Sequence, residues 1–153
     1  MKTTTVTIID APAANIFPWL EDTDRMKQWL PNLVEDVPLT ETPDKIGSTF
    51  RQVYHERGKD MEMIGEVTAY SENERMRAYI TADMFDLDVD YHLKPLGPEQ
   101  TELTQYTEIK FKGFIKIMKP LMVLMSKFSQ KDPTADAHAV MKELIEAEYG
   151  APS

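Results

Sequence analysis

The sequence contains no cysteine. Without a thiol, the chain can form no disulfide, has no cysteine nucleophile and offers no zinc–cysteine site. A glycine-rich phosphate loop is missing as well. Only three histidines are present, His55, His92 and His138, and long stretches of sequence separate them. We therefore predict no metal site and no cofactor.

Long apolar runs and basic clusters are also scarce. No run approaches the ~18 apolar residues that a membrane-spanning helix needs, and residues 1–13 lack the apolar centre of a signal peptide. The net charge is −9, which repels nucleic acids and anionic membrane surfaces. These absences predict a cytoplasmic protein that binds no nucleic acid and does not insert stably into a membrane.

Two features that the sequence does have, its length and its many methionines, are also informative. The chain has 153 residues, which predicts one domain covering residues 1–153. Its ten methionines have flexible, polarizable side chains that suit an adaptable apolar interior. Ordinary core filling explains them equally well, so the methionines alone do not define a site.

Two kinds of periodicity divide the chain. Residues 3–10 alternate and predict a strand. Residues 11–30 predict two short helices: Pro18 distorts the first, and Asp22 or Thr23 caps the second. From residue 34 to residue 111 the apolar period is two, with only short turns between runs. This pattern predicts a six-stranded antiparallel meander.

The C-terminal third is predicted to be helical. Residues 119–130 are apolar nearly all round, which indicates burial on several sides. Asp132 is a predicted helix cap and Pro133 a predicted first helical residue, so the helix should break or kink there. A concave sheet around this helical segment would bury the apolar faces of both, an α+β architecture.

Four stretches carry a resemblance to a known family: "VTIIDAPAANIFPWLEDTDRMKQWLP", "KIGSTFRQVYHERGKDMEMIGEVTAY", "GPEQTELTQYTEI" and "AVMKELIEAE". Their order and character resemble the START-related SRPBCC superfamily, which includes polyketide cyclase/dehydratase-like proteins and lipid-transfer domains. The resemblance implies the helix-grip fold, in which a seven-stranded antiparallel sheet wraps around a long C-terminal helix. It also implies a cavity between sheet and helix for an apolar or amphipathic ligand.

Alternation along the strands predicts which side chains face that cavity. In residues 49–57, Phe50, Gln52 and Tyr54 suit the buried face better than their neighbours do. If "PLGPE" forms a turn, Tyr91 pairs with Gln105 and Val89 with Thr107. Buried polar groups need partners, so these groups either bond one another and trapped water or anchor a ligand.

The predicted ligand-binding residues share an inward position on the sheet, on the helical cover or at the end of the second short helix. Trp29 can be a plug in the core or part of the pocket rim. The segment "FIKIMKPLMVLM" is predicted to cover the sheet with methionines at helical spacing. The full set is Trp29, Gln52, Tyr54, Met61, Met63, Ile80, Met84, Tyr91, Gln105, Thr107, Met118, Met122 and Met125.

Three functions remain open at this point. The leading hypothesis is a monomeric or homodimeric protein that binds an apolar or amphipathic small molecule, such as a lipid or an aromatic, polyketide-like compound. An alternative is a cyclase or dehydratase in which Tyr91, Tyr54 or Gln105 polarises a carbonyl or relays a proton. A third is an interaction module that resembles the co-chaperone members of the superfamily.

Overall fold

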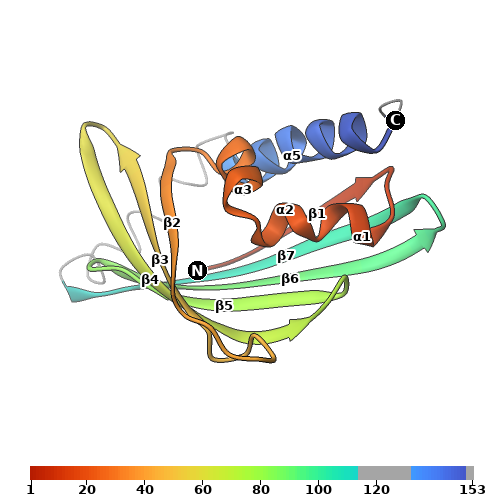
Figure 1. Cartoon of the computed structure of the whole chain (residues 1–153). Coiled ribbons are helices and arrows are strands. Elements are labelled where there is room, and N and C mark those ends of the chain that lie inside the picture. The colour runs from red at the N-terminus through yellow and green to blue at the C-terminus, as the bar shows by residue number, and fades with distance from the viewer. Residues whose placement is uncertain (114–131, 151–153) are drawn as a thin grey trace.

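The period-two region folds into six consecutive strands, each antiparallel to the next. The computed structural model describes residues 1–113 and 132–150. In it the first strand pairs with the last, which gives the sheet order β1-β7-β6-β5-β4-β3-β2 (Figure 1). The strands are β1 (Lys2–Ile9), β2 (Leu33–Thr40), β3 (Thr49–Glu56), β4 (Lys59–Ser71), β5 (Arg75–Thr81), β6 (Phe85–Gly97) and β7 (Gln100–Phe111). The predicted seven-stranded helix-grip architecture is confirmed.

The register between β6 and β7 is also the predicted one. Tyr91 lies opposite Gln105, and Val89 lies opposite Thr107. A slip of one residue would have moved every side chain to the other face, so this pairing decides what faces inward. On β3, Gln52 is buried while His55 is exposed, as the alternation predicts.

The period-two pattern is interrupted between β5 and β6. β5 ends at Thr81, and the amide of Ala82 donates to the carbonyl of Phe85 in a tight turn. Met84 lies in this turn with 56% of its surface exposed. The prediction that Met84 faces the cavity is therefore wrong, because the strand ends before Met84 and the alternation of side chains ends with it.

Three short helices, rather than two, follow β1. They are α1 (Ala13–Ile16), α2 (Pro18–Glu21) and α3 (Thr23–Trp29). The first predicted helix divides at Pro18, which has no N–H to donate to the preceding turn. Asp22 caps α3, and its Oδ2 accepts from the amide of Arg25 at 3.2 Å.

The described part of the C-terminal region is α5 (Pro133–Gly150). Asp132 caps it as predicted, with Oδ1 accepting from the amide of Ala135 at 3.1 Å. The helix lies beside β1 (Figure 1), and the Lys142 ammonium donates to the carbonyl of Ile8 at 2.8 Å. On this helix His138 is buried against the sheet, whereas Val140 is 45% exposed. The predicted cover, residues 114–125, lies outside the described residues.

Trp29 is part of the core between the short helices and α5. Its side chain is 4% exposed, and its indole N–H donates to the carbonyl of Trp19 at 2.7 Å. Its ring meets the rings of Tyr91 and His138 edge-on, with centroids 6.5 and 6.1 Å away. The structure thus favours the core interpretation of Trp29 over the pocket rim.

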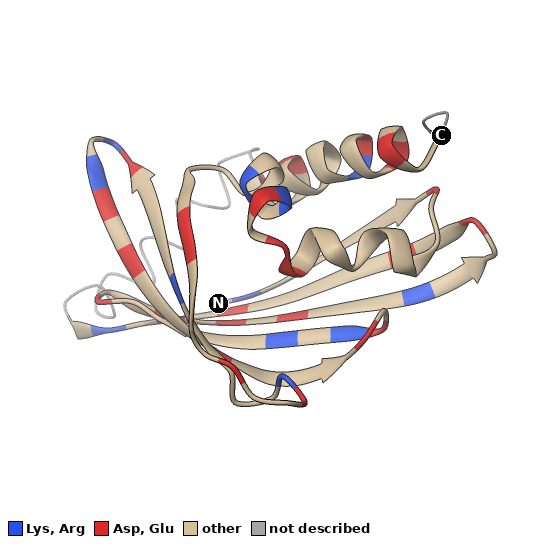
Figure 2. Cartoon of the chain, in the orientation of Figure 1, with Lys and Arg blue, Asp and Glu red and all other residues tan. Residues whose placement is uncertain are grey.

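The opposite face of the sheet is charged. Arg75 pairs in a bidentate manner with Asp90, and Arg77 with Asp88, across β5 and β6. Figure 2 shows basic positions on β5 beside acidic ones on the neighbouring strand. Polar pairs of this kind leave the apolar residues on the other side of the sheet. Among the helices of residues 1–113 and 132–150, none combines the length and the apolar character of a membrane span.

Candidate functional site

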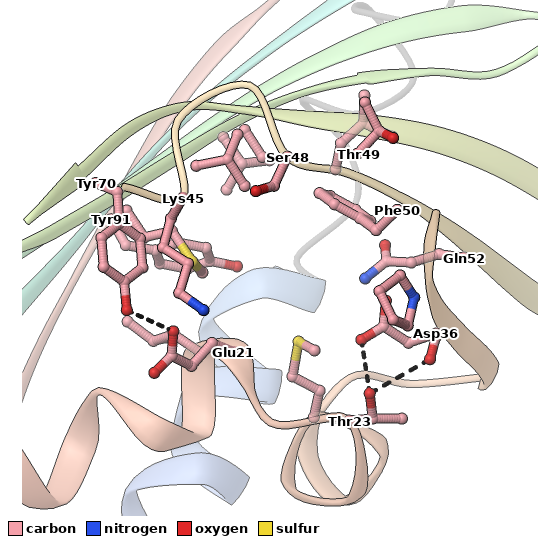
Figure 3. Close-up of a pocket in the computed structure, with 18 of the residues that line it drawn as sticks. Glu21, Thr23, Asp36, Lys45, Ser48, Thr49, Phe50, Gln52, Tyr70 and Tyr91 are labelled. Atoms are coloured by element: carbon pink, nitrogen blue, oxygen red, sulfur yellow. Dashed lines mark hydrogen bonds between the residues drawn. The ribbon is translucent and has the colours of Figure 1, made fainter. Parts of the chain in front are cut away.

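A pocket of about 420 Å³ opens on the inner face of the sheet (Figure 3). We call it the inner pocket. Its walls come from α2, α3, β2 and the inner faces of β3 to β7, and residues of the β2–β3 loop contribute as well. The apolar lining is largest on the sheet side, where Val67, Ala78, Ile80, Leu87 and Val89 lie on neighbouring strands.

The family resemblance implies a cavity between the sheet and the C-terminal helix. The structure describes only α5 of that helical region, and no residue of α5 lines the inner pocket. The reason is that α5 packs along β1 at one edge of the sheet, where Thr7 and His138 are hydrogen-bonded. The predicted cover, residues 114–125, lies outside the described residues. From the short helices, Leu20 and Glu21 of α2 and Thr23 and Met26 of α3 line the pocket.

A close contact between two strands shapes one wall. Phe50 lies opposite Gly65 in the β3–β4 pairing, and its ring lies directly over the glycine. A Cβ built on Gly65 would be 2.2 Å from Cζ of Phe50. Because glycine has no side chain, the tip of the ring can approach β4 closely and leave the pocket open.

A chain of hydrogen bonds between polar side chains connects α5 with β1 and β7. Nε2 of His138 donates to Oε1 of Gln105 at 2.6 Å, and Nδ1 accepts from the hydroxyl of Thr7 at 2.9 Å. The amide nitrogen of Gln105 donates to Thr107 at 3.1 Å. Burial lowers the pKa of His138 to about 4, so the imidazole is neutral near pH 7. This chain holds the side chain of Gln105 in one orientation at the pocket wall.

Tyr91 projects into the pocket next to Gln105. Its hydroxyl has no hydrogen-bond partner among the described residues, whereas its ring packs edge-on against Trp29. Burial raises the pKa of the Tyr91 hydroxyl, and the neighbouring Tyr54 raises it further. The hydroxyl is therefore a neutral group that can donate to or accept from a bound molecule.

A second polar group surrounds Asp36. The hydroxyl of Thr23 donates to Oδ2 of Asp36 at 3.0 Å (Figure 3), and Asp36 lies opposite Gln52 in the β2–β3 pairing. Tyr54 donates its hydroxyl to Oε1 of Gln52 at 3.2 Å. Burial raises the pKa of Asp36, while hydrogen bonds from Thr23 and Gln52 lower it in part. Burial and the charge of Asp36 raise the pKa of Tyr54 to about 12.

A third set of polar side chains in the pocket lining consists of Glu21, Tyr70 and Lys45. The hydroxyl of Tyr70 donates to Oε2 of Glu21 at 2.8 Å (Figure 3). Burial and this acidic partner raise the pKa of Tyr70. Lys45, on the β2–β3 loop, also lines the pocket. Charged groups of both signs thus surround an apolar interior.

Five of the predicted ligand-binding residues line the inner pocket. None of the other predicted residues is among its described lining residues. Met63 is buried in an apolar cluster with Ile80 and Val89, and Met61 packs against that cluster. Thr107 holds Gln105, and Trp29 lies behind Tyr91. Met118, Met122 and Met125 lie outside the described residues. The five predicted residues that line the pocket are Gln52, Tyr54, Ile80, Tyr91 and Gln105.

Sequence reasoning missed several residues of the site. In the sequence His138 is only one of three scattered histidines, and no pattern singles out Asp36, Glu21 or Lys45. The position of His138, one residue after buried Ala137 in an amphipathic helix, is a usable signal. For Asp36 no local signal exists, because its neighbour Thr23 lies on a different element. Within the two described ranges, no three His, Asp or Glu side chains form a group that could hold a metal ion.

Together, the sheet, the covering helices and the inner pocket define a helix-grip protein with a partly enclosed small-molecule-sized cavity. The chain belongs to the family described as polyketide cyclase / dehydrase and lipid transport, whose model matches residues 1–144. The predicted membership of the START-related superfamily is thereby confirmed. No curated protein matches the sequence significantly.

Solved structures agree on the fold. An aromatase/cyclase from a Streptomyces species superposes with a TM-score of 0.75 at 14% identity, covering 100% of this chain and 98% of that chain. A protein from Thermus thermophilus has a TM-score of 0.74 at 16% identity, covering 97% and 99%. A START superfamily protein from Mycobacterium smegmatis has a TM-score of 0.70 at 19% identity, covering 94% and 98%. At these identities the similarity shows the shared fold alone.

Proposed function

We propose that the protein binds an amphipathic small molecule in the inner pocket. The observation that carries this proposal is the pocket itself, with about 420 Å³ of space and a mostly apolar lining interrupted by a few oriented polar groups. That volume and composition are typical of small-molecule sites. The family description, which names lipid transport beside cyclase and dehydrase activity, is consistent with a ligand of this kind.

Tyr91 and Gln105 are the proposed polar anchors of the ligand. The hydroxyl of Tyr91 has no partner within the described part of the chain, and Gln105 is held at the wall by His138. A ligand oxygen near them would gain hydrogen bonds without rearranging the protein. Preorganised donors of this kind favour binding because little conformational freedom is lost.

Titration with 1-naphthylmethanol, followed by calorimetry and by native mass spectrometry, tests the proposal. We expect one bound molecule per chain. Tyr91→Phe should weaken binding while leaving the thermal midpoint nearly unchanged, because the hydroxyl it removes bonds no described protein group. A protein that binds neither this probe nor any longer-chain alcohol would refute the proposal.

A cyclase or dehydratase is the second candidate function. Asp36 favours it, since a carboxyl group with a raised pKa in a pocket is suited to proton transfer. Tyr54 and Tyr91 lie in the same pocket. Turnover of an aromatic polyketide-like substrate that is lost in Asp36→Asn would support an enzyme, and binding without any turnover would support a carrier.

A further inference from the structure

The charges around the inner pocket are unequal. Its lining contains four carboxylate residues, Glu21, Asp22, Asp36 and Glu41. Among the described residues that line it, only Lys45 is basic. This imbalance concerns the same site as the proposed function, and it bears on the charge of the molecule that the site accepts.

Three of the four carboxylates have different partners. Asp22 lies 3.4 Å from the guanidinium of Arg25, and Glu21 accepts a hydrogen bond from the neutral hydroxyl of Tyr70. Asp36 accepts from two neutral groups, the hydroxyl of Thr23 and the side-chain amide of Gln52. Across residues 1–113 and 132–150 no basic nitrogen lies within 4 Å of Asp36, and Lys27 acts on it only as the weakest of four influences.

Two aromatic residues flank Gln52, the residue opposite Asp36 on β3. Phe50 and Tyr54 follow on the same face, two residues before and two residues after Gln52, and both line the pocket. Figure 3 shows Asp36, Gln52 and Phe50 along this wall. Diagonal neighbours in an antiparallel pair are within reach of aromatic side chains.

A half-buried carboxylate near a tyrosine is suited to a cation. Removal from water destabilises the charged form of Asp36, as the raised pKa of its carboxyl group indicates. A cation beside it would offset that cost. The negative faces of Phe50 and Tyr54 would attract the same cation. An anion at this place would be repelled by Asp36. Among the described residues that line the pocket, Lys45 is the single basic one that could offset this repulsion.

We propose that the preferred ligand of the inner pocket carries an ammonium group on an apolar body, a proposal that rests on the proposed function. Asp36 would bind the ammonium at the wall to which Phe50 and Tyr54 also contribute. The apolar body lies against the inner faces of β5 and β6, on Ile80 and Val89. The hydroxyl of Tyr54 already donates to Gln52, so its ring is held in place before the ligand arrives.

Three probes that share one ring system separate charge from shape: 1-naphthylmethylamine, 1-naphthylmethanol and 1-naphthoate. Calorimetry at pH 7 on the full-length protein measures each affinity. We expect the amine to bind about tenfold more tightly than the alcohol, and the carboxylate to bind most weakly. Equal affinity for amine and alcohol, or a preference for the carboxylate, would overturn the ammonium proposal.

Matched variants test which residues cause the preference for the amine over the alcohol. Asp36→Asn should lower the affinity for the amine about tenfold and that for the alcohol by a smaller factor. A cooperative thermal unfolding transition shows that the variant is folded. Phe50→Leu should weaken the amine more than the alcohol. Asp83→Asn removes the same charge from an exposed turn that does not line the pocket, and it should change neither affinity. An Asp36→Asn protein that binds the amine as tightly as the wild type does would overturn the proposal.

The outcomes distinguish the two proposals. If the alcohol binds and the amine has no advantage, the inner pocket remains a ligand site and only the ammonium preference is refuted. If none of the three probes binds to the folded wild-type protein, the proposed function itself fails, and the ammonium proposal fails with it.

Discussion

Gly65 does not line the inner pocket, but its replacement by alanine should make the pocket smaller by displacing Phe50. Gly65 lies on β4 beneath the ring of Phe50. An added Cβ would lie 2.2 Å from Cζ and 2.5 Å from Cε2 of that ring. Ordinary carbon contacts begin at 3.4 Å, so the ring must move by the difference between 3.4 and 2.2 Å, about 1.2 Å. Because β4 lies behind the ring, the movement is directed into the pocket.

The cost of this change follows from overpacking. Inserting a methyl group into a packed region typically destabilises a protein by about 1–3 kcal/mol. For a chain of this length each kcal/mol lowers the thermal midpoint by roughly 2–4 °C. We therefore expect a midpoint that is roughly 2–12 °C lower and an affinity for 1-naphthylmethanol that is reduced, since the displaced ring occupies ligand space.

Differential scanning calorimetry and probe titration measure both effects. Gly97→Ala is the matched control, because nothing lies within 4 Å of a Cβ at Gly97. The double variant Gly65→Ala with Phe50→Leu should recover part of the lost stability, since leucine has no ring tip at the point of contact. If Gly65→Ala keeps both the wild-type midpoint and the wild-type affinity, the argument that this glycine keeps the pocket open is wrong.

Two further predictions concern buried polar groups. Trp29→Phe removes the indole N–H that donates to the carbonyl of Trp19 at 2.7 Å. The unpaired carbonyl should lower the free energy of unfolding by about 1–3 kcal/mol in urea titrations, and an unchanged value would show that water replaces the bond. The second concerns His138, whose pKa burial lowers to about 4 from 6.5. The unfolded chain therefore binds a proton at higher pH than the folded one, so stability is full above pH 6.5 and falls toward pH 4 by up to about 3 kcal/mol. His138→Gln should lose this part of the pH dependence, and unfolding curves that stay parallel to the wild type from pH 4 to pH 7 would contradict the assignment.

Much of the sheet could be predicted because its rules are local. Alternation assigns Gln52 and Tyr54 to one face, and the short turn between β6 and β7 pairs Tyr91 with Gln105. The two caps, Asp22 and Asp132, follow from the residues immediately around them. At Met84 the same rule fails, because the turn after β5 ends the alternation earlier.

The site was less predictable because its contacts join distant parts of the chain. Gln105 and His138 are 33 residues apart, and Glu21 and Tyr70 are 49 apart. Nothing near Asp36 in the sequence indicates that Thr23 donates to it. Such pairs form only where two elements are packed together in the folded chain.

By itself, the sequence determined the order of the strands and the inward position of Gln52, Tyr91 and Gln105, since short-range periodicity and turn lengths encode both. Its motifs carry the family resemblance. Only the tertiary structure decided that residues of α2 and α3, and none of α5, line the described pocket. It also decided that His138 orients Gln105 and that Asp36 accepts a hydrogen bond from Thr23. The physical reason is that the pocket is the space left when helices dock on a curved sheet, and docking depends on side-chain packing across the whole chain.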